Sequence, residues 1–318
     1  MADLVKKDMI EEKASENKTV CFEASITDDD ERIDKVVTNW FQDLSRSYIQ
    51  KMIKDGNVFV NEKIVKANYR VKEGDVIRCT IPACVEPEIL AEDMPLDILY
   101  EDEDILVVNK PKGMVVHPSA GHYSGTLVNG LLFHCKGQLS GINGVFRPGI
   151  VHRIDKDTTG SLIVCKSESA HKAIAEQLKE HSVTRKYRAI VYGNFEQEEG
   201  TIDAPIGRDI HDRKKMAVNE KNGKSAVTHY RVLEQFKGYS YIECQLETGR
   251  THQIRVHMTS IGHPLLGDEV YGNRMSKFKL QGQCLHAMII GFVHPLKKQY
   301  MEFTAPLPEY FTHLLQIL

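Results

Sequence analysis

Residues 152–160, His-Arg-Ile-Asp-Lys-Asp-Thr-Thr-Gly, gather side chains that could carry out covalent chemistry. Asp155 lies between Arg153 and Lys156, and two threonines and a glycine follow shortly after it. Cationic neighbours and hydroxyl or amide donors keep a carboxyl group ionised. Because an ionised carboxylate suits a nucleophile better than an acid, any chemistry at Asp155 would be nucleophilic.

A turn and a strand should position this segment. Residues 147–149 are Arg-Pro-Gly, which favours a turn, and residues 161–164 are rich in β-forming side chains. The polar residues therefore fall on a loop that leads into a strand, where functional side chains are commonly found. On these residues alone a simpler alternative is favoured, in which Asp155 begins an Asx turn and Arg153 is a surface charge.

A second polar group falls on a helix predicted over residues 251–261. His252 and His257 are five positions apart, so they lie well over a right angle apart around that helix, unlike the i, i+4 histidine pair of a zinc helix. We therefore expect no metal site. Arg250 and Arg255 are separated in the same way and are not expected to serve one target. Arg250, at the start of the helix, could contact a phosphate or a structural carbonyl.

No cofactor signature accompanies these groups. The sequence contains no P-loop, no Gly-x-Gly-x-x-Gly motif after a strand and no cluster of metal ligands. Its seven cysteines form no Cys-x-x-Cys pair, which favours reduced thiols in an intracellular protein. No segment approaches the length of a membrane span. We therefore expect a cytoplasmic protein that needs no metal, nucleotide or redox cofactor and contacts no membrane.

The net charge of −3 hides an uneven distribution of charge along the chain. Residues 1–31 carry −6 and residues 83–109 carry −9, whereas residues 32–82 carry +4 and residues 110–318 carry +8. The acidity therefore lies in a tail and a connector, and the two remaining parts are basic. Two basic domains suit a polyanionic ligand better than the total charge suggests.

A chain of 318 residues is long for one core, so more than one domain is expected. We predict a flexible tail (1–25), a small basic domain of two helices and a small sheet (26–82), an acidic linker (83–104) and a catalytic domain (105–318). In the small domain, apolar residues recur at helical spacing, and a hairpin and a further strand follow.

Most of the chain resembles a known family, and the likeness is most specific in residues 152–160. This run is similar to the active-site signature of the RluA/RluD-type RNA pseudouridine synthases, His-Arg-Leu-Asp-x-x-Thr-Ser-Gly. Residues 109–118 resemble the family's Asn-Lys-Pro-x-Gly segment, residues 184–193 its Lys-x-Tyr motif, and residues 249–268 its third motif.

The resemblance implies roles for individual residues. Asp155 becomes the catalytic nucleophile or base, and Arg255 pairs with it. Tyr187 would stack on the uracil or form a hydrogen bond with it. Arg153 would occupy the gap left when the uridine is flipped out of the RNA. The predicted substrate-binding side chains of this domain are Arg153, His152, Arg250 and His117.

Residues 26–82 resemble the S4 RNA-binding domain. The similarity rests on the segments Arg32-x-Asp34, Ser45-Arg46-Ser47, Gly56-x-Val58-x-Val60-Asn61 and Gly74-Asp75. Arg46, Lys51 and Lys54, on the second predicted helix, are expected to contact phosphates without reading sequence. The alternative is a small α/β module with some other partner.

Together these features predict an α+β protein. The resemblance implies the pseudouridine synthase fold, a mixed, mainly antiparallel curved sheet with flanking helices, preceded by a small α/β S4 domain. We expect a monomeric enzyme that converts uridines of large-subunit ribosomal RNA, alone or in a pre-ribosomal particle, to pseudouridine and does not bind DNA. Whether Asp155 attacks uracil C6 or ribose C1′, or removes a proton from C2′, stays open.

Two alternatives come from other functional classes. A non-catalytic RNA-binding or assembly factor could have the same basic domains, but it would not need Asp155, Tyr187 and Arg255 together. A hydrolase of glycosidic bonds could use Asp155 as its nucleophile. Glycosidases normally place a second carboxyl group across the bond, and Asp157, two positions away, is a poor partner.

Overall fold

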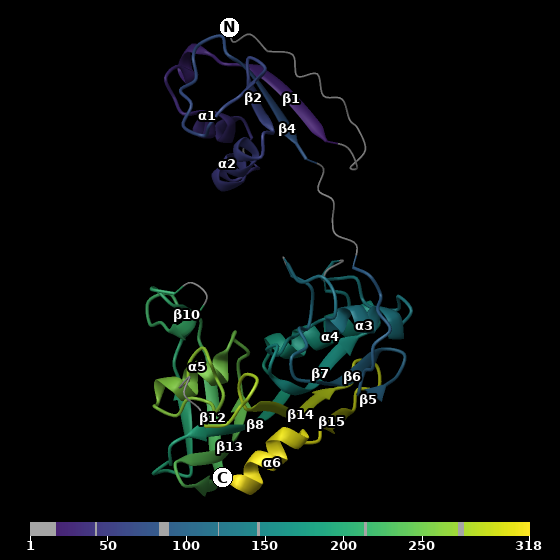
Figure 1. Ribbon diagram of the computed structural model, residues 1–318. Helices are drawn as coiled ribbons and strands as arrows, with labels where there is room; N and C mark the ends of the chain where they lie inside the picture. The colour runs from purple at the N-terminus through teal and green to yellow at the C-terminus, as the bar shows by residue number, and fades with distance from the viewer. Residues whose placement is uncertain are drawn as a thin grey trace. The chain divides into compact units, whose positions relative to one another are not determined.

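The chain divides into two compact units, Met1–Pro87 and Glu88–Leu318 (Figure 1). The computed structural model describes residues 17–41, 43–82, 89–119, 121–144, 147–212, 215–272 and 277–318. No helix in these ranges has both the length and the apolar composition needed to cross a bilayer.

The first unit packs two helices against a four-stranded antiparallel sheet of order β1-β4-β2-β3. Its elements are β1 (Lys18–Glu23), a 3-10 turn η1 (Ile26–Asp28), α1 (Ile33–Trp40), α2 (Arg46–Lys54), β2 (Val58–Val60), β3 (Lys63–Ile64) and β4 (Val76–Ile81). Ser45 caps α2 as predicted, because its hydroxyl accepts the Tyr48 N–H over 3.3 Å. The apolar residues at helical spacing are buried between the helices and the sheet.

Strand β1 corrects the predicted boundary of the tail. Lys18–Glu23 fall within the expected tail of residues 1–25, yet they pair along their whole length with β4. Phe22 is buried, and its ring stacks on that of Trp40 at 4.3 Å. The charged residues on both sides of this segment had favoured a tail, but the segment is an edge strand of the sheet. Residues 1–16 of the expected tail lie outside the described residues.

The second unit is built on a nine-stranded sheet of order β5-β6-β7-β14-β8-β13-β12-β9, with β15 also paired to β14. All neighbouring strands are antiparallel except β7 and β14, so the sheet is mixed and mainly antiparallel, as predicted. The strands are β5 (Ile98–Glu101), β6 (Ile105–Lys110), β7 (Thr159–Cys165), β8 (Thr184–Tyr192), β9 (Glu199–Asp203), β12 (Val227–Phe236), β13 (Tyr239–Leu246), β14 (Leu285–Val293) and β15 (Tyr300–Thr304). A separate ribbon pairs β10 (Ile206–Arg208) with β11 (Met216–Val218).

Strand β5 corrects the predicted linker in the same way. Ile98–Glu101 fall within residues 83–104, but they pair with β6, and Ile89 is buried in the main core. The acidic side chains around them had favoured a solvated connector. Residues 83–88 lie outside the described residues.

Helices cover both faces of the large sheet. They are α3 (Leu127–His134), α4 (Glu168–Lys179), α5 (Gln253–Ser260) and α6 (Glu309–Ile317). Apolar residues of α3 and α5 share one core with alternate residues of β6, β7, β8 and β13, whereas α4 and α6 pack on the intervening residues of these strands. Every residue of β7 is therefore buried, which explains the apolar run Leu-Ile-Val-Cys over residues 162–165.

Gly160 lets β7 and β14 approach closely just after the loop that carries Asp155. Its φ of 111° lies in the left-handed region. A Cβ atom at this position would collide with the backbone of Ala287 on β14. The glycine that ends the signature segment therefore has a packing role in the one parallel contact of the sheet.

Candidate active site

Arg255 of α5 forms ion pairs with two carboxylates at once. Its Nη1 donates to Oδ2 of Asp155 over 2.9 Å, although the two residues are 100 positions apart in the chain. Its Nε and Nη2 donate to the two carboxylate oxygens of Asp268 over 2.7 Å and 3.0 Å. The ion pair expected between Asp155 and Arg255 is present, and a second acid holds the same guanidinium.

The two acids differ in burial. The Asp268 side chain is fully buried, whereas that of Asp155 is 20% exposed. Burial favours the neutral form of Asp268, but the bonds from Arg255, with backbone N–H groups of Tyr271 and Val270, outweigh burial and lower its pKa. Burial also opposes the charge of Arg255, yet its bonds to Asp268 and Asp155 raise its pKa. Arg255 is therefore a fixed cation, and Asp155 is the partner that reaches the surface.

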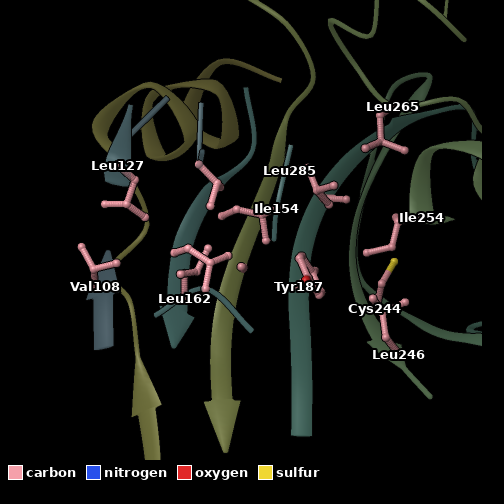
Figure 2. Packing of buried hydrophobic residues seen from close by; sticks show 14 of the residues in the cluster. Val108, Leu127, Ile154, Leu162, Tyr187, Cys244, Leu246, Ile254, Leu265 and Leu285 are labelled. Atoms are coloured by element: carbon pink, nitrogen blue, oxygen red, sulfur yellow. The ribbon is translucent and has the colours of Figure 1, made fainter. Parts of the chain in front are cut away.

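The loop that carries Asp155 is anchored on both sides. Ile154 is buried in the main core, among the residues shown in Figure 2. On the other side, Nζ of the fully buried Lys110 lies 2.9 Å from each of three carbonyl oxygens, those of Pro111, Met114 and Lys156. Burial disfavours the charged form and lowers the pKa of Lys110 to about 7. The three carbonyl oxygens nevertheless match the three N–H donors of the ammonium form. These contacts fix the backbone on either side of Asp155.

Gln253 fixes the start of α5. Its side-chain oxygen accepts the Thr248 hydroxyl over 2.8 Å and the Arg250 N–H over 2.9 Å. Its Nε2 donates to the Val227 carbonyl over 2.9 Å. These bonds tie the helix to the end of β13 and to β12, so that Arg255, on the first turns of α5, is held against Asp155.

A small pocket lies beside Asp155. It is lined by the loop before β7, by β8, β13 and β14, and by the start of α5. Its volume is about 60 Å³, room for a few water molecules, and the pocket opens to solvent. A larger hollow of about 750 Å³ beside the β10–β11 ribbon shares none of these lining residues. We therefore locate the candidate chemistry in the smaller pocket.

Tyr187 of β8 lines the pocket and is itself buried. In Figure 2 it lies on its strand beside the labelled core residues. Burial raises the pKa of its hydroxyl. The charge of Arg185 opposes this shift and the charge of Asp155 adds to it, so the side chain stays a neutral phenol. Among the described residues, no group of three or more His, Cys, Asp or Glu side chains could hold a metal ion.

The sequence and fold of this chain match one family. A sequence model of the RNA pseudouridylate synthase family matches residues 104–260, and a model of the S4 domain matches residues 31–77. A Bacillus subtilis protein named uncharacterized RNA pseudouridine synthase YlyB is 56% identical over 91% of this chain and 94% of its own. The chain belongs to the RNA pseudouridine synthases.

Two further relatives agree with this assignment. A Zymomonas mobilis protein named ribosomal large subunit pseudouridine synthase D is 46% identical over 90% of this chain and 93% of its own. The solved structure of human RNA pseudouridylate synthase domain containing 1 matches with a TM-score of 0.56 and 28% identity, covering 70% of this chain and 87% of that one. The predicted family, enzyme class and fold, with an S4 domain at the N-terminus, are confirmed.

Two of the predicted substrate-binding residues of this pseudouridine synthase have structural partners. Nε2 of His152 accepts the Ile163 N–H over 2.9 Å, and burial lowers the pKa of His152 to about 3. This neutral ring holds the loop against β7 and does not line the pocket. Nε of Arg250 donates to the Ser225 carbonyl over 2.9 Å, the structural alternative considered for it, while its side chain also lines the pocket.

The other two predicted substrate-binding residues of the catalytic domain lie differently. Arg153 is exposed and lines the pocket beside Asp155. His117 is buried and does not line it, and its Nδ1 has no hydrogen-bond partner among the described residues. Burial, followed by the charge of Arg153, lowers the pKa of His117 to about 4. His117 is therefore a neutral, buried ring that feels the charge of Arg153.

In the S4 unit of the synthase, a buried acid holds Arg46. The carboxylate of Asp34 accepts bonds from Arg46 over 3.0 Å, from Arg32 over 3.0 Å and from Gln50 over 2.6 Å. Burial would raise the pKa of Asp34, but these donors lower it to about 2. The Arg46 and Arg32 side chains remain 46% and 38% exposed, so both guanidinium groups can still reach a phosphate. The other predicted RNA contacts of this unit, Lys51 and Lys54, are exposed on α2.

Sequence reasoning assigned no role to Asp268, Tyr271 or Lys110. Lys110 is far from the other two in the sequence, and no spacing rule connects Asp268 with Arg255. A signal was nevertheless present, because Lys110 is the last residue of a mostly apolar strand and Asp268 follows the run Pro-Leu-Leu-Gly. A charge at the end of a segment built for burial has to find a partner, although the sequence does not say which one.

Proposed function

We propose that this enzyme isomerises a uridine of large-subunit ribosomal RNA to pseudouridine, with the uridine flipped into the pocket and Asp155 as the nucleophile or base. The observation that carries the proposal is the position of Asp155, the one acid among the described residues that line the pocket. The name of the Zymomonas relative supports the choice of large-subunit ribosomal RNA. The exposed arginines and lysines of the S4 unit are proposed to contact phosphates of the same RNA.

The reaction breaks the bond between N1 and C1′, turns the uracil and joins C5 to C1′. The proton on C5 is lost and N1 gains one, so the substrate is neither oxidised nor reduced. Asp155 begins the reaction at C6, at C1′ or at the proton on C2′, and each route needs a carboxylate oxygen open to the substrate. Arg255 bonds to Oδ2, which leaves Oδ1 on the side of His252, 3.8 Å away.

Two further side chains are proposed to hold the flipped uridine. Tyr187 offers a neutral aromatic face and a hydroxyl at the wall of the pocket, suited to stacking on the uracil. Arg153 lies beside Asp155, is exposed, and has a long cationic side chain that can enter the RNA where the base has left.

The arrangement of acids disfavours the hydrolase alternative. A glycosidase places a second carboxyl group across the bond it cleaves. Asp268, the acid nearest to Asp155 through Arg255, is fully buried and bonded by both carboxylate oxygens to that arginine. Asp157 has a buried oxygen and does not line the pocket. Among the described residues, no second acid is available at the pocket.

The test is Asp155→Asn in the full chain, with pseudouridine mapped in ribosomal RNA by carbodiimide-dependent primer extension and by mass spectrometry. We expect pseudouridine formation to be abolished and RNA binding to change by no more than a few-fold. Asp203→Asn, which removes an exposed carboxylate from the edge strand β9, is the matched control and should keep full activity. Substantial pseudouridine with Asp155→Asn would remove Asp155 from its role, and release of uracil by the wild type would favour the hydrolase.

The non-catalytic alternative is tested in cells. Ribosomal RNA from a strain that lacks the gene should lose one or more pseudouridines. Complementation with the wild type should restore them, and complementation with Asp155→Asn should not. Restoration by Asp155→Asn would mean that the chain assists modification or assembly by binding alone.

A further inference from the structure

His252 lies at the pocket in an unusual backbone conformation. It precedes the first residue of α5 and has φ 58° and ψ 22°, in the left-handed region that non-glycine residues seldom adopt. Such strained residues persist where surrounding contacts hold them, and they are concentrated at functional sites. The conformation places the ring where it lines the pocket, with Nε2 3.8 Å from Oδ1 of Asp155.

Tyr271 fixes the other side of the His252 ring. Its hydroxyl lies 2.8 Å from Nδ1 of His252 and accepts the N–H of Met216 over 2.9 Å. The Tyr271 ring also lies under Arg255, with the guanidinium carbon 5.0 Å from the ring centre. One tyrosine therefore contacts the histidine, the catalytic ion pair and strand β11.

These contacts specify which nitrogen of His252 carries the proton. The Tyr271 oxygen already accepts the Met216 N–H, so its own proton is best used in donation to Nδ1. The carboxylate of Asp155, on the opposite side of the ring, favours a proton on Nε2. Burial lowers the pKa of His252. The negative charge of Asp155 opposes this shift and the positive charge of Arg255 adds to it, so the ring is neutral. Both neighbours therefore select the neutral form with a proton on Nε2.

We propose that His252 donates a hydrogen bond from Nε2 to a carbonyl oxygen of the flipped uracil, and that Tyr271 is the positioning residue that keeps this donor in place. The inference rests on the proposed function and adds a substrate contact to it. A separation of 3.8 Å from Asp155 exceeds hydrogen-bond length, so this N–H is available to a group that enters the pocket.

The chemistry of the reaction needs such a donor. When the bond between N1 and C1′ breaks heterolytically, the electron pair stays on the uracil and is shared with its two carbonyl oxygens. A donor fixed in advance at one of these oxygens stabilises the developing charge without moving. No proton transfer is required, so a neutral histidine whose proton is held on Nε2 can serve throughout the reaction.

The first test needs no RNA. In full-length protein labelled with ¹⁵N in its histidine rings, the nitrogen chemical shifts of His252 should report the Nε2-protonated neutral form at pH 7. Tyr271→Phe should change these shifts, because Nδ1 loses its donor. Tyr300→Phe, which removes an exposed hydroxyl at the start of β15, is the matched control and should not. A proton on Nδ1, or a charged ring, in the wild type would overturn the proposal.

The second test measures the reaction on ribosomal RNA fragments that contain the mapped uridine. His252→Ala should lower kcat on the order of 10²-fold, the effect of removing a preorganised donor, with little change in KM. His252→Asn, which tolerates the left-handed backbone and retains an N–H donor, should recover part of this loss. His313→Ala, at an exposed position on α6, is the control and should leave kcat unchanged.

Sulfur substitution in the substrate identifies the contact itself. Fragments with 2-thiouridine or 4-thiouridine at the target should slow the wild type at one of the two positions and slow His252→Ala far less there. Equal slowing of both enzymes at both positions would overturn the contact. If the wild type forms no pseudouridine in any RNA, the proposed function fails, and the nitrogen shifts still decide the state of His252 independently.

Discussion

Arg255→Ala and Asp155→Asn should both abolish activity, but only the first should destabilise the catalytic unit. Arg255 contacts Asp268, whose side chain is fully buried, and Asp155, whose side chain is 20% exposed. Removal of the arginine leaves a buried carboxylate without its cation. Removal of the Asp155 charge leaves Arg255 still bonded to Asp268 through two nitrogens.

The expected magnitudes follow from this asymmetry. Removing one partner of a buried ion pair costs about 3–5 kcal/mol. The backbone N–H groups of Val270 and Tyr271 still bond to Asp268 at 2.9 Å and 3.1 Å, so we expect a loss at the lower end, about 3 kcal/mol, for Arg255→Ala. For Asp155→Asn we expect less than about 1 kcal/mol, because partly exposed pairs contribute little.

The destabilisation should also depend on pH. In the wild type the pKa of Asp268 is lowered, so its stabilising contribution is present above the unfolded pKa and is lost as pH falls through the folded one. Without Arg255, burial is the largest remaining influence and raises the pKa of Asp268. The folded variant therefore binds a proton at Asp268 more readily than the unfolded chain does, and it gains stability as the pH falls. The difference between wild type and Arg255→Ala should therefore be largest near neutral pH and shrink in acid.

The two units allow separate measurement. The chain has one tryptophan, Trp40, which lies in the S4 unit, so its fluorescence reports that unit alone. Urea unfolding of the catalytic unit can be followed by amide hydrogen exchange of β7 and β8, with Trp40 fluorescence as the internal control. Equal destabilisation by the two substitutions, or wild-type stability of Arg255→Ala, would refute the role given to Asp268. A shift in the Trp40 transition would mean that the effect is not local.

Three further predictions concern other parts of the chain. Asp34→Asn should lower the unfolding free energy of the S4 unit by about 1–3 kcal/mol, because three donors lose their ionised acceptor. Trp40 fluorescence measures this change, and an unchanged unfolding transition would contradict the prediction. Lys110→Met should lower the unfolding free energy of the catalytic unit by at least about 2 kcal/mol, because the Lys156 carbonyl and two other carbonyls lose a buried donor. Pseudouridine formation should fall as well, and full activity would show that the loop keeps its position without Lys110. Deletion of residues 1–87 should weaken binding to ribosomal RNA and blur the choice of uridine without ending the chemistry, and unchanged selectivity in pseudouridine mapping would remove the role proposed for the S4 unit.

The sequence was most informative where motif and chemistry coincide. The family, the mixed and mainly antiparallel sheet and the S4 domain all followed from short segments such as residues 152–160. The contact between Asp155 and Arg255 also followed from the resemblance. Residue types alone had favoured an Asx turn, because a carboxylate between two cations does not indicate where the chain will place its distant partner.

The sequence was least informative where burial decides a residue's role. His152 and Arg250 stand in the same motifs as Asp155 and Arg255, yet His152 bonds to the Ile163 amide and Nε of Arg250 bonds to a carbonyl. A motif does not separate side chains that hold a loop from side chains that reach the substrate. The strands β1 and β5 were missed for a related reason, because few of their residues are buried and charged neighbours mask the alternation.

The arrangement of Arg255 answers a physical difficulty of this kind of site. A carboxylate proposed to react with RNA has to remain accessible, but an accessible ion pair is weak and poorly oriented. Here the buried ion pair with Asp268 fixes the orientation of the Arg255 guanidinium. The guanidinium in turn orients the partly exposed carboxylate of Asp155. Asp268 thus supplies the buried partner of the arginine, so that Asp155 can be held in one orientation and still remain partly exposed.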